Sequence, residues 1–246
     1  MTHTAHPLAN TFAPTGELRV AINVGNPILA RRHPDTGEPE GISIDLATQL
    51  AQRLGVPLKL VVFEAASKSV DALSQDVADV GFFAIDPTRG ETIAFTTPYV
   101  LIHGAYMVKQ ESPLQSNDEV DRAGHTVVVG KGSAYDLYLS RELKAAELVR
   151  SPTSPEVVSF FLEHGHDVAA GVKPQLEAEL SKYPNLRMLP GHFMVISQAM
   201  GVPKNRGPEA QAFLTQFVED MKAAGVVAEA MTRHHIEGAT LAPLAS

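Results

Sequence analysis

Short apolar runs alternate with amphipathic stretches along this chain, and that alternation limits the folds open to it. Apolar runs at residues 18–24, 58–63 and 80–85 have the length of buried strands. Helical spacing separates them, in a helix expected from Asp45 to residue 54 and another over 67–75. Strands that alternate with helices form a parallel sheet with helices on its faces. The pattern therefore predicts an α/β protein.

A second series of the same kind follows a polar linker at residues 109–122. Its expected strands are 125–129, 148–150 and 167–170, and its expected helices are 135–144, one opened by Ser154 and Pro155, and 173–182. Two extended apolar connectors flank this series, one over 100–108 with a break at His103-Gly104 and one over 191–200. Two helices, 207–224 and one ending near His235, come last. The small residues after Gly238 predict a loose tail.

This order predicts two lobes. Residues 1–101 and 198–246 would form a discontinuous first lobe, and residues 102–197 would form the second. Each lobe would be a mostly parallel sheet flanked by helices, and the two chain crossings would make a two-strand hinge. A cleft between such lobes is where a small ligand is expected.

Composition excludes several functions. The net charge is −8 without any run of Lys or Arg, so we expect no nucleic-acid partner. The chain has no cysteine, which removes disulfides and thiolate chemistry. The motif for a P-loop and the GxGxxG motif are missing, and no His pair has the spacing of a zinc hydrolase, so we expect no cofactor and no metal. The residues give no sign of a secretory leader or of a membrane span of ~20 apolar residues, so the expected location is the cytoplasm, or the periplasm if a leader was removed.

Residues 79–99 contain the strongest candidate for a ligand contact. An apolar strand ends at residue 85, Asp86 stands at a helix N-cap, and Pro87 takes the first helical position. Arg89 would then lie at the carboxyl end of a strand, the edge where open α/β sheets bind ligands. We expect Arg89 to bind a carboxylate. As an alternative, Arg89 is a surface residue that pairs with Glu91.

Five segments in register resemble the bacterial extracellular solute-binding proteins of family 3, the type II periplasmic binding proteins of polar amino-acid ABC transporters. The matching segments are residues 16–22 (GELRVAI), 41–55 (GISIDLATQLAQRLG), 78–100 (ADVGFFAIDPTRGETIAFTTPYV), 127–139 (VVVGKGSAYDLYL) and 222–231 (KAAGVVAEAM). The resemblance implies a two-lobed binding protein that encloses a small anionic or zwitterionic ligand and serves a transporter permease.

Carried over residue by residue, the resemblance places the carboxylate-binding arginine of the family at Arg89. The Gly-Ser turn of the second lobe falls on Gly132 and Ser133, and its N–H groups would meet the same carboxylate. The remaining ligand contacts implied are Asn26, Ala66, Phe82, Ala84, Lys131, Ala134, Tyr135, Lys173 and Gln175. Ser133 is also explained as a helix cap alone, Lys173 as a solvated residue and Gln175 as polar helix surface.

Departures from the family pattern concern the ligand's ammonium group. Phe82, Phe83 and Ala84 stand where small hydroxyl residues are usual, and Asn26 or Gly25 replaces an aromatic residue. The acid that pairs with the α-ammonium, five residues after Asp167, is Val172 here, next to Lys173. A missing charge-assisted hydrogen bond costs about 1.5–3 kcal/mol. We therefore expect a small carboxylate that is not a standard α-amino acid.

An enzyme on the same fold is the alternative, because relatives include cyclohexadienyl dehydratase, a lyase that acts on small carboxylic acids. Its general acid aligns roughly with Gln175, which cannot deliver a proton as Glu does. Lys173 and Gln175 would be the catalytic candidates, and His103 or His192 could supply acid–base chemistry. If the protein is a binding protein and not an enzyme, we expect no catalytic residue.

Overall fold

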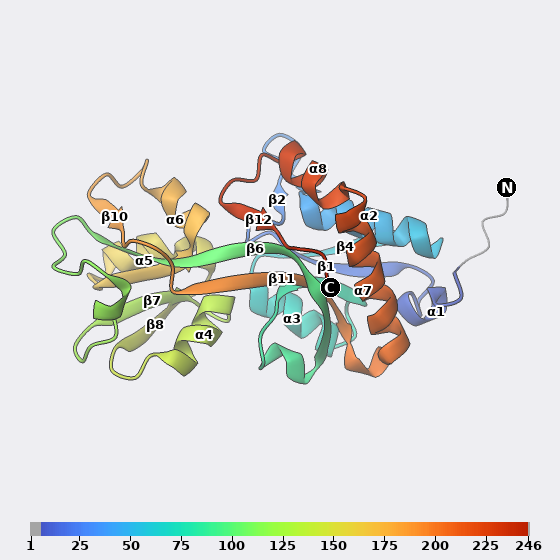
Figure 1. Ribbon diagram of the computed structural model, residues 1–246, viewed down its shortest axis with the longest axis horizontal. Helices are drawn as coiled ribbons and strands as arrows, with labels where there is room; N and C mark the ends of the chain where they lie inside the picture. Colours follow the sequence, from blue (N-terminus) through green and yellow to red (C-terminus); the bar gives the residue numbers. More distant parts are fainter. Residues whose placement is uncertain (1–5, 246) are drawn as a thin grey trace. The chain divides into compact units, whose positions relative to one another are not determined.

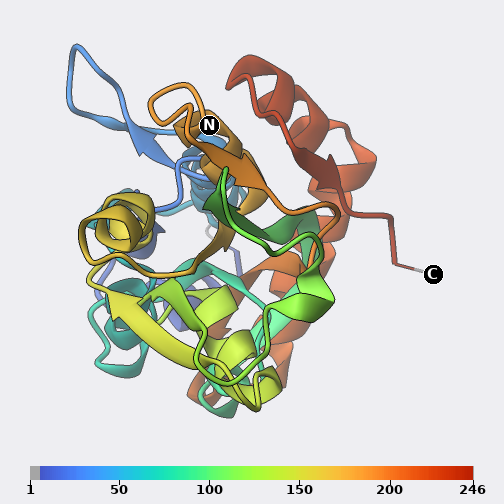
Figure 2. The same ribbon diagram turned by 90° about the vertical axis from the view of Figure 1, so that its left-hand side faces the viewer.

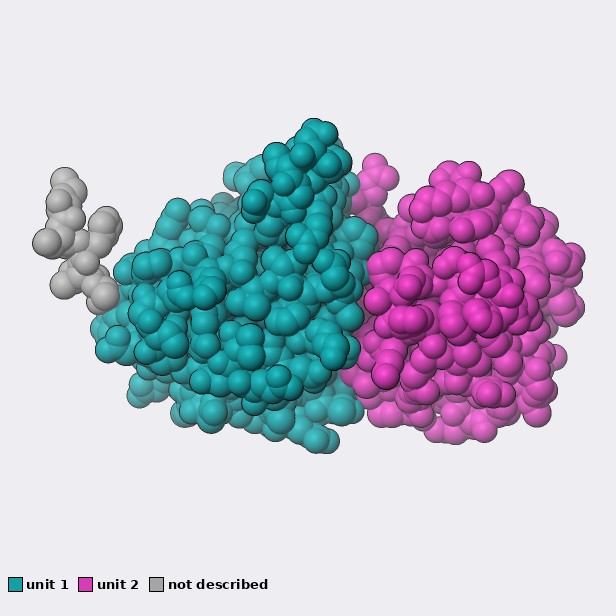
Figure 3. Space-filling view, turned by 180° about the vertical axis from the view of Figure 1, so that it is seen from behind, with its two compact units in different colours: residues 1–100, 197–236, 241–246 teal, residues 101–196, 237–240 magenta. Residues whose placement is uncertain are grey.

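The computed structural model describes residues 6–245 and divides the chain into two compact units. Unit 1 comprises residues up to Val100, then Ser197–Ile236 and the end from Leu241, and unit 2 comprises Leu101–Ile196 and Glu237–Thr240 (Figure 3). Residues 1–5 and 246 of the expected first lobe lie outside the described residues. Residues 237–240, which we expected in the first lobe, group with unit 2 instead.

Unit 1 is built on a sheet with strand order β4-β1-β5-β11. Strands β1 (Leu18–Asn23), β4 (Leu58–Phe63) and β5 (Val80–Ala84) are parallel, and β11 (Met194–Pro203) runs antiparallel to β5. The three parallel strands coincide closely with the three apolar runs of the sequence. The prediction of an α/β fold is confirmed here.

Helices cover this sheet because each presents an apolar stripe to it. They are α1 (Ala9–Phe12), α2 (Ile42–Leu54), α3 (Ala66–Ser74), α7 (Pro208–Ala223) and α8 (Val226–Arg233). Helix α2 ends at Gly55, whose φ of 70° is the left-handed conformation that closes a helix. The polar excursion after β1 is a small hairpin of β2 (Arg31–Arg32) and β3 (Pro39–Glu40).

Unit 2 repeats the arrangement around β9 (Val168–Val172), which lies between β6 (Ile93–Lys109) and β7. Strands β7 (Thr126–Gly130) and β8 (Glu147–Ser151) are parallel, as are β7 and β9. Helices α4 (Ala134–Glu142) and α5 (Val157–Glu163) lie on either side of β8 (Figure 2). Helix α6 (Lys173–Glu179) continues directly from β9, and β10 (Leu186–Met188) pairs with β6.

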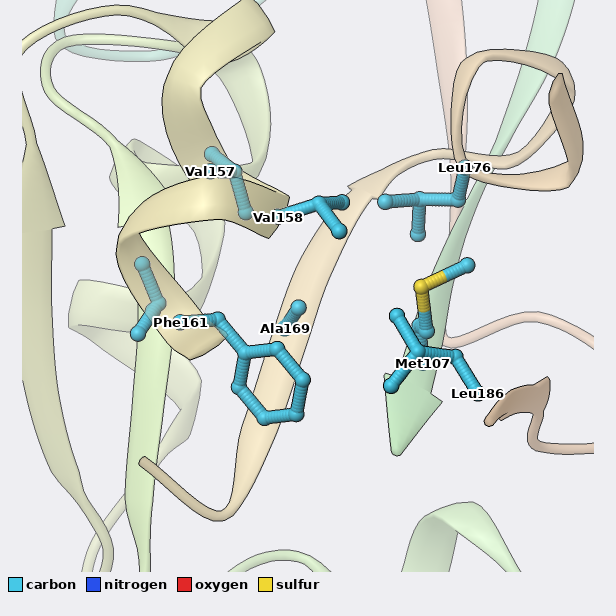
Figure 4. Close-up of a cluster of buried hydrophobic side chains, with 8 residues drawn as sticks. Met107, Val157, Val158, Phe161, Ala169, Leu176 and Leu186 are labelled. Carbon is cyan, nitrogen blue, oxygen red and sulfur yellow. The ribbon is translucent and has the colours of Figure 1, made fainter. Parts of the chain in front are cut away.

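The core of unit 2 forms where α5 packs on the sheet. Phe161, Val157 and Val158 from α5 meet Ala169 of β9 and Met107 of β6 (Figure 4). Val128, Leu176 and Leu186 complete this buried cluster. Its removal from water is the main force that holds α5 and α6 on the sheet.

Two long strands carry the chain from one unit to the other (Figure 1). They are β6 (Ile93–Lys109) and β11. The expected break at His103-Gly104 is absent, because Gly104 pairs in register with Val172. A Cβ at Gly104 would come within 2.7 Å of Met194 Cγ, so glycine allows close packing here and does not end the strand.

The expectation of a loose tail is also wrong. Residues Ala239–Leu241 form β12, which pairs with β6, and the Ala242 N–H donates to the Tyr99 carbonyl at 3.1 Å. Buried Lys222 of α7 donates to the Pro243 carbonyl at 2.8 Å and to the Pro98 carbonyl at 3.1 Å. The tail's own composition could not show these partners, since they come from distant parts of the chain.

Within residues 6–245, the remaining elements are the short 3₁₀ helices Arg89–Glu91, Asn117–Glu119, Ser154–Glu156 and Lys204–Arg206. Among residues 6–245, none of the helices combines the length and the apolar character that crossing a membrane requires.

Candidate ligand-binding site

Arg89 follows the central strand of unit 1, and the local sequence holds it there. One carboxylate oxygen of Asp86, Oδ1, accepts the N–H of Thr88 at 2.8 Å and that of Arg89 at 3.4 Å. Asp86 thus accepts N–H groups of this turn as a cap does, but the helix is the single 3₁₀ turn Arg89–Glu91, with Thr88 and not Asp86 at the N-cap position, so Pro87 is not its first residue. The cap turns the chain at the end of β5 and sends the Arg89 side chain back toward the strand, where Nη1 donates to the Ala84 carbonyl at 3.2 Å.

The Arg89 side chain is buried, with 6% of the residue exposed. Burial lowers the pKa of its guanidinium to about 10, although the nearby Asp86 carboxylate opposes that shift. The group therefore keeps its charge at neutral pH. This burial contradicts the alternative in which Arg89 is a surface residue. A desolvated guanidinium favours an anionic partner strongly, because little water screens the interaction.

Two other predicted contacts of unit 1 follow neighbouring parallel strands. Asn26 lies in the turn after β1, and Ala66 opens α3 after β4. Because the carboxyl ends of parallel strands share one edge of a sheet, these positions lie at the same edge as Arg89. The side-chain oxygen of Asn26 is buried and accepts no hydrogen bond within the described part of the chain. It is an acceptor that a ligand N–H or O–H could use.

Phe82 and Ala84, also predicted as contacts, are both buried in β5. The Phe82 ring meets Tyr99 edge-on, with ring centroids 6.1 Å apart, and Phe83 packs on the opposite side in a cluster with Leu73 and Ile93. Every residue of β5 is buried, so both faces of the strand are covered. Ala84 contributes its carbonyl oxygen to Arg89.

In unit 2, the predicted turn leads into α4. Gly132 has φ of 70°, and Ser133 is the N-cap of α4, where its Oγ accepts the Asp136 N–H at 3.1 Å. The Gly132 N–H donates to the Asp136 carboxylate at 2.8 Å. That N–H is thus engaged by an internal carboxylate, and a ligand would have to share it. Capping by Ser133 is confirmed.

Sequence reasoning missed the role of Asp136. Its buried carboxylate accepts hydrogen bonds from Gly132, from Ser140 Oγ at 3.1 Å and from Arg150 Nε at 3.0 Å. Part of the signal was present, because an acid in the first turn of a helix is favoured by the helix dipole. The partner Arg150 lies on β8 and could not be identified from local spacing.

The other predicted positions of this turn differ in exposure. Lys131 is exposed, with its N–H on the Ser151 carbonyl at 3.0 Å, and Ala134 is the first residue of α4. Tyr135 is buried, and burial raises the pKa of its hydroxyl. Tyr135 and Gln175 line one small cavity inside unit 2, together with Ser154 and Glu179. Gln175 is therefore not simple helix surface.

Lys173 begins α6 immediately after buried Val172, the last residue of β9. The Lys173 ammonium lies 3.9 Å from Glu177 and its side chain is about a third exposed, at 35%. Asp167 accepts the N–H and the hydroxyl of Thr126, each at 2.8 Å. The position at which the family resemblance implied an acid is thus apolar here, with a lysine beside it.

Within residues 6–245, no group of three or more His, Asp or Glu side chains is arranged to hold a metal ion.

Solved structures share this fold over nearly the whole chain. The fold matches a mutant of ArgBP from T. maritima with a TM-score of 0.78 and 21% identity, over 93% of this chain and 99% of that one. It matches the cysteine-binding protein of Campylobacter jejuni with a TM-score of 0.77 and 18% identity, over 92% of both chains. The protein therefore has the α/β fold of the type II periplasmic binding proteins.

The sequence identifies the family within that fold class. Residues 18–236 match the bacterial extracellular solute-binding proteins, family 3, and the chain belongs to that family. It is 30% identical to the glutamine-binding protein of Geobacillus stearothermophilus over 122 residues, which are 48% of this chain and 46% of that protein. The similarity thus spans about half the length of this relative.

Proposed function

We propose that this protein is the substrate-binding component of an ABC transporter and that it binds a small carboxylate through Arg89. The observation that carries the proposal is the burial of a charged guanidinium at the carboxyl end of the parallel strands of unit 1. A carboxylate can accept two parallel hydrogen bonds from such a group, and this geometry gives both affinity and orientation.

The chemistry of unit 2 supports a solute other than a standard α-amino acid. Relatives are named for glutamine, arginine or cysteine, yet Val172 offers no charge to an α-ammonium, and Lys173 repels one. In unit 1, the Asn26 oxygen is an uncharged acceptor that suits a ligand hydroxyl as well as an amine. We propose that the ligand contacts of unit 2 are Gly132, Ser133 and the start of α6.

A ligand screen with matched variants tests the proposal. Calorimetry with amino acids, 2-hydroxy acids, 2-oxo acids and dicarboxylates identifies what the wild-type protein binds. Replacing Arg89 by Met removes the charge but keeps an apolar chain, and we expect a loss of affinity of about 2–5 kcal/mol, as for a partner lost from a buried charged pair. The control is Arg32→Met, which removes an exposed arginine of the same unit. If Arg89→Met binds the solute as tightly as wild type, the assignment of Arg89 is wrong.

The enzymatic alternative is tested with the same preparation. A cyclohexadienyl-dehydratase-like lyase would consume prephenate, and Lys173→Met or Gln175→Glu would change its rate. Binding without turnover of any ligand in the screen supports the transport function.

The proposed function also implies a permease partner and a cellular location. Substrate delivery requires docking to a permease outside the cytoplasmic membrane, so we propose an extracytoplasmic location for the working protein. Cell fractionation checks this: recovery of the native protein only in the cytoplasm would favour an enzyme or sensor on this fold.

A further inference from the structure

The last described residues of the chain pass through both compact units. The chain leaves unit 1 after Ile236, groups with unit 2 over residues Glu237–Thr240 and returns to unit 1 at Leu241. Strand β12 lies in this passage and pairs with β6, so the passage is part of the sheet. We call residues 237–245 the C-terminal strap.

The strap meets unit 2 at the first turn of α6. A Cβ atom on Gly238 would lie 2.3 Å from the Cγ atom and 2.9 Å from the Cβ atom of Pro174, so only glycine lets the backbone of the strap approach the proline ring this closely. The φ of Gly238 is 71°, which also favours glycine. Pro174 follows Lys173, the first residue of α6, so the contact holds the start of the helix.

Helix α6 has little of its own to fix this start. It is 7 residues long, and isolated helices shorter than about 12 residues are marginal in water. Among the described residues, no side chain caps its N-terminus. Leu176 is buried in the core of unit 2, whereas Lys173 and Pro174 are partly exposed. The first turn therefore depends on tertiary contacts, and the strap supplies one at Pro174.

The other end of the strap is fixed in unit 1. Ala242 is 1% exposed and donates its N–H to the Tyr99 carbonyl at 3.1 Å. Lys222 Nζ donates to the Pro243 carbonyl at 2.8 Å. Only the 3 residues of β12 separate Ala242 from Gly238. Because a strand is already close to its full length, the strap has no slack between its two attachments.

We propose that the C-terminal strap positions the start of α6 for solute binding and that Gly238 is the positioning residue. The inference rests on the proposed function, in which the start of α6, with Lys173, is a ligand contact of unit 2. The strap acts through α6 and not by touching the solute. Because its other end is fixed by Lys222, a change in unit 1 would loosen a helix of unit 2.

Hydrogen exchange tests the strap without a ligand. Gly238→Ala puts a Cβ atom into the space of the Pro174 ring and should lift the strap from α6. We expect the amides of residues 177–179, which bond back to the first turn, to exchange about tenfold faster, relative to α5 of the same unit. The matched control is Gly165→Ala, where a φ of 69° imposes the same strain but a Cβ atom would meet no described atom within 4 Å. Exchange within about twofold of wild type in Gly238→Ala would overturn the inference.

A change at the far attachment tests whether the strap acts as a unit. Lys222→Met should also speed the exchange of residues 177–179, whereas Lys204→Met, which alters an exposed lysine of unit 1, should not. If the Ala242 N–H loses its protection in Lys222→Met while α6 exchanges as in wild type, the strap does not transmit the change and the inference is wrong. If Ala242 stays protected in that variant, the result of Gly238→Ala decides.

Calorimetry with lactate, pyruvate, succinate and glutamine as probes tests the effect on binding. We expect Gly238→Ala to weaken the tightest of them about tenfold, a change that Gly165→Ala should not produce. Faster exchange in α6 with unchanged affinity would make the strap a purely structural element and overturn its positioning role.

Arg89→Met separates this inference from the proposed function. Binding that is lost in Arg89→Met but unchanged in Gly238→Ala keeps the proposed function and overturns the role of the strap. Binding that neither variant affects overturns both. If the wild-type protein binds no small carboxylate at all, the proposed function fails and the positioning role fails with it.

Discussion

The attachment of the C-terminal tail depends on one buried ammonium group. The Lys222 side chain is 1% exposed, and its Nζ lies 2.7 Å from Glu219 and within 3.1 Å of two carbonyl oxygens, those of Pro98 and Pro243. Glu219 also accepts hydrogen bonds from Thr97 and from the Ala245 N–H. We predict that Lys222→Met, which keeps the apolar stem, destabilises the protein and releases the tail.

The magnitude follows from these contacts. Breaking a buried charge pair costs about 3–5 kcal/mol. The cost should be about 2–4 kcal/mol here, because Glu219 keeps its other two donors and the Pro243 carbonyl can reach water when the tail opens. For a chain of this size, that corresponds to a fall in Tm of roughly 4–16 °C.

Calorimetric melting measures the loss of stability in Lys222→Met and in Glu219→Gln. The double variant then gives the coupling energy between the two residues. Lys204→Met, an exposed lysine of unit 1, is the control. Hydrogen exchange should show the Ala242 N–H newly exposed in Lys222→Met. A Tm within about 2 °C of wild type, together with unchanged exchange at Ala242, would refute the reasoning.

The same pair predicts acid sensitivity. Burial by itself would raise the pKa of Glu219, but the hydrogen bonds from Lys222, Thr97 and Ala245 outweigh it and hold the pKa below its ordinary value of 4.5. Since the folded pKa is depressed, the stabilisation is present above that value and is lost as the pH falls through the folded pKa. Melting of Glu219→Gln should therefore depend less on pH than melting of wild type below about pH 4.5. Parallel pH profiles would contradict this.

Three further outcomes are expected. Asp79→Ala should lower the free energy of unfolding in urea by about 3–5 kcal/mol, because the buried Asp79 carboxylate pairs with both Arg19 and Arg206. A decrease of less than about 1 kcal/mol would contradict this. Ser133→Ala should cost about 1 kcal/mol by removing the cap of α4, whereas Ser133→Asp should not. Burial lowers the pKa of His103, so the stabilisation that its neutral ring gives the folded protein is present above the ordinary pKa of 6.5 and is lost as the pH falls. His103→Asn should therefore flatten the pH dependence of Tm between about pH 7 and pH 5.

Local patterns in the sequence determined most of the helices and strands. The strand 58–63 was predicted with its observed bounds, and α2 ends at Gly55 as expected, because apolar spacing and a left-handed glycine act within a few residues. The cap at Asp86 is equally local, since its carboxylate bonds residues two and three positions later. The position of Arg89 at the end of β5 could therefore be inferred without a structure.

What the sequence left open depends on residues far apart in the chain. The burial of Arg89 requires the whole sheet of unit 1, and the continuity of β6 through His103-Gly104 requires Val172 as its partner. The tail is ordered by Lys222, and the rings of His103 and His192 stack only because the segment before β11 lies beside β6. Spacing along a chain reports interactions within a turn of helix or across a tight loop. Burial, long-range pairing and the desolvation of charges arise only when distant segments pack together, so the tertiary structure alone decided them.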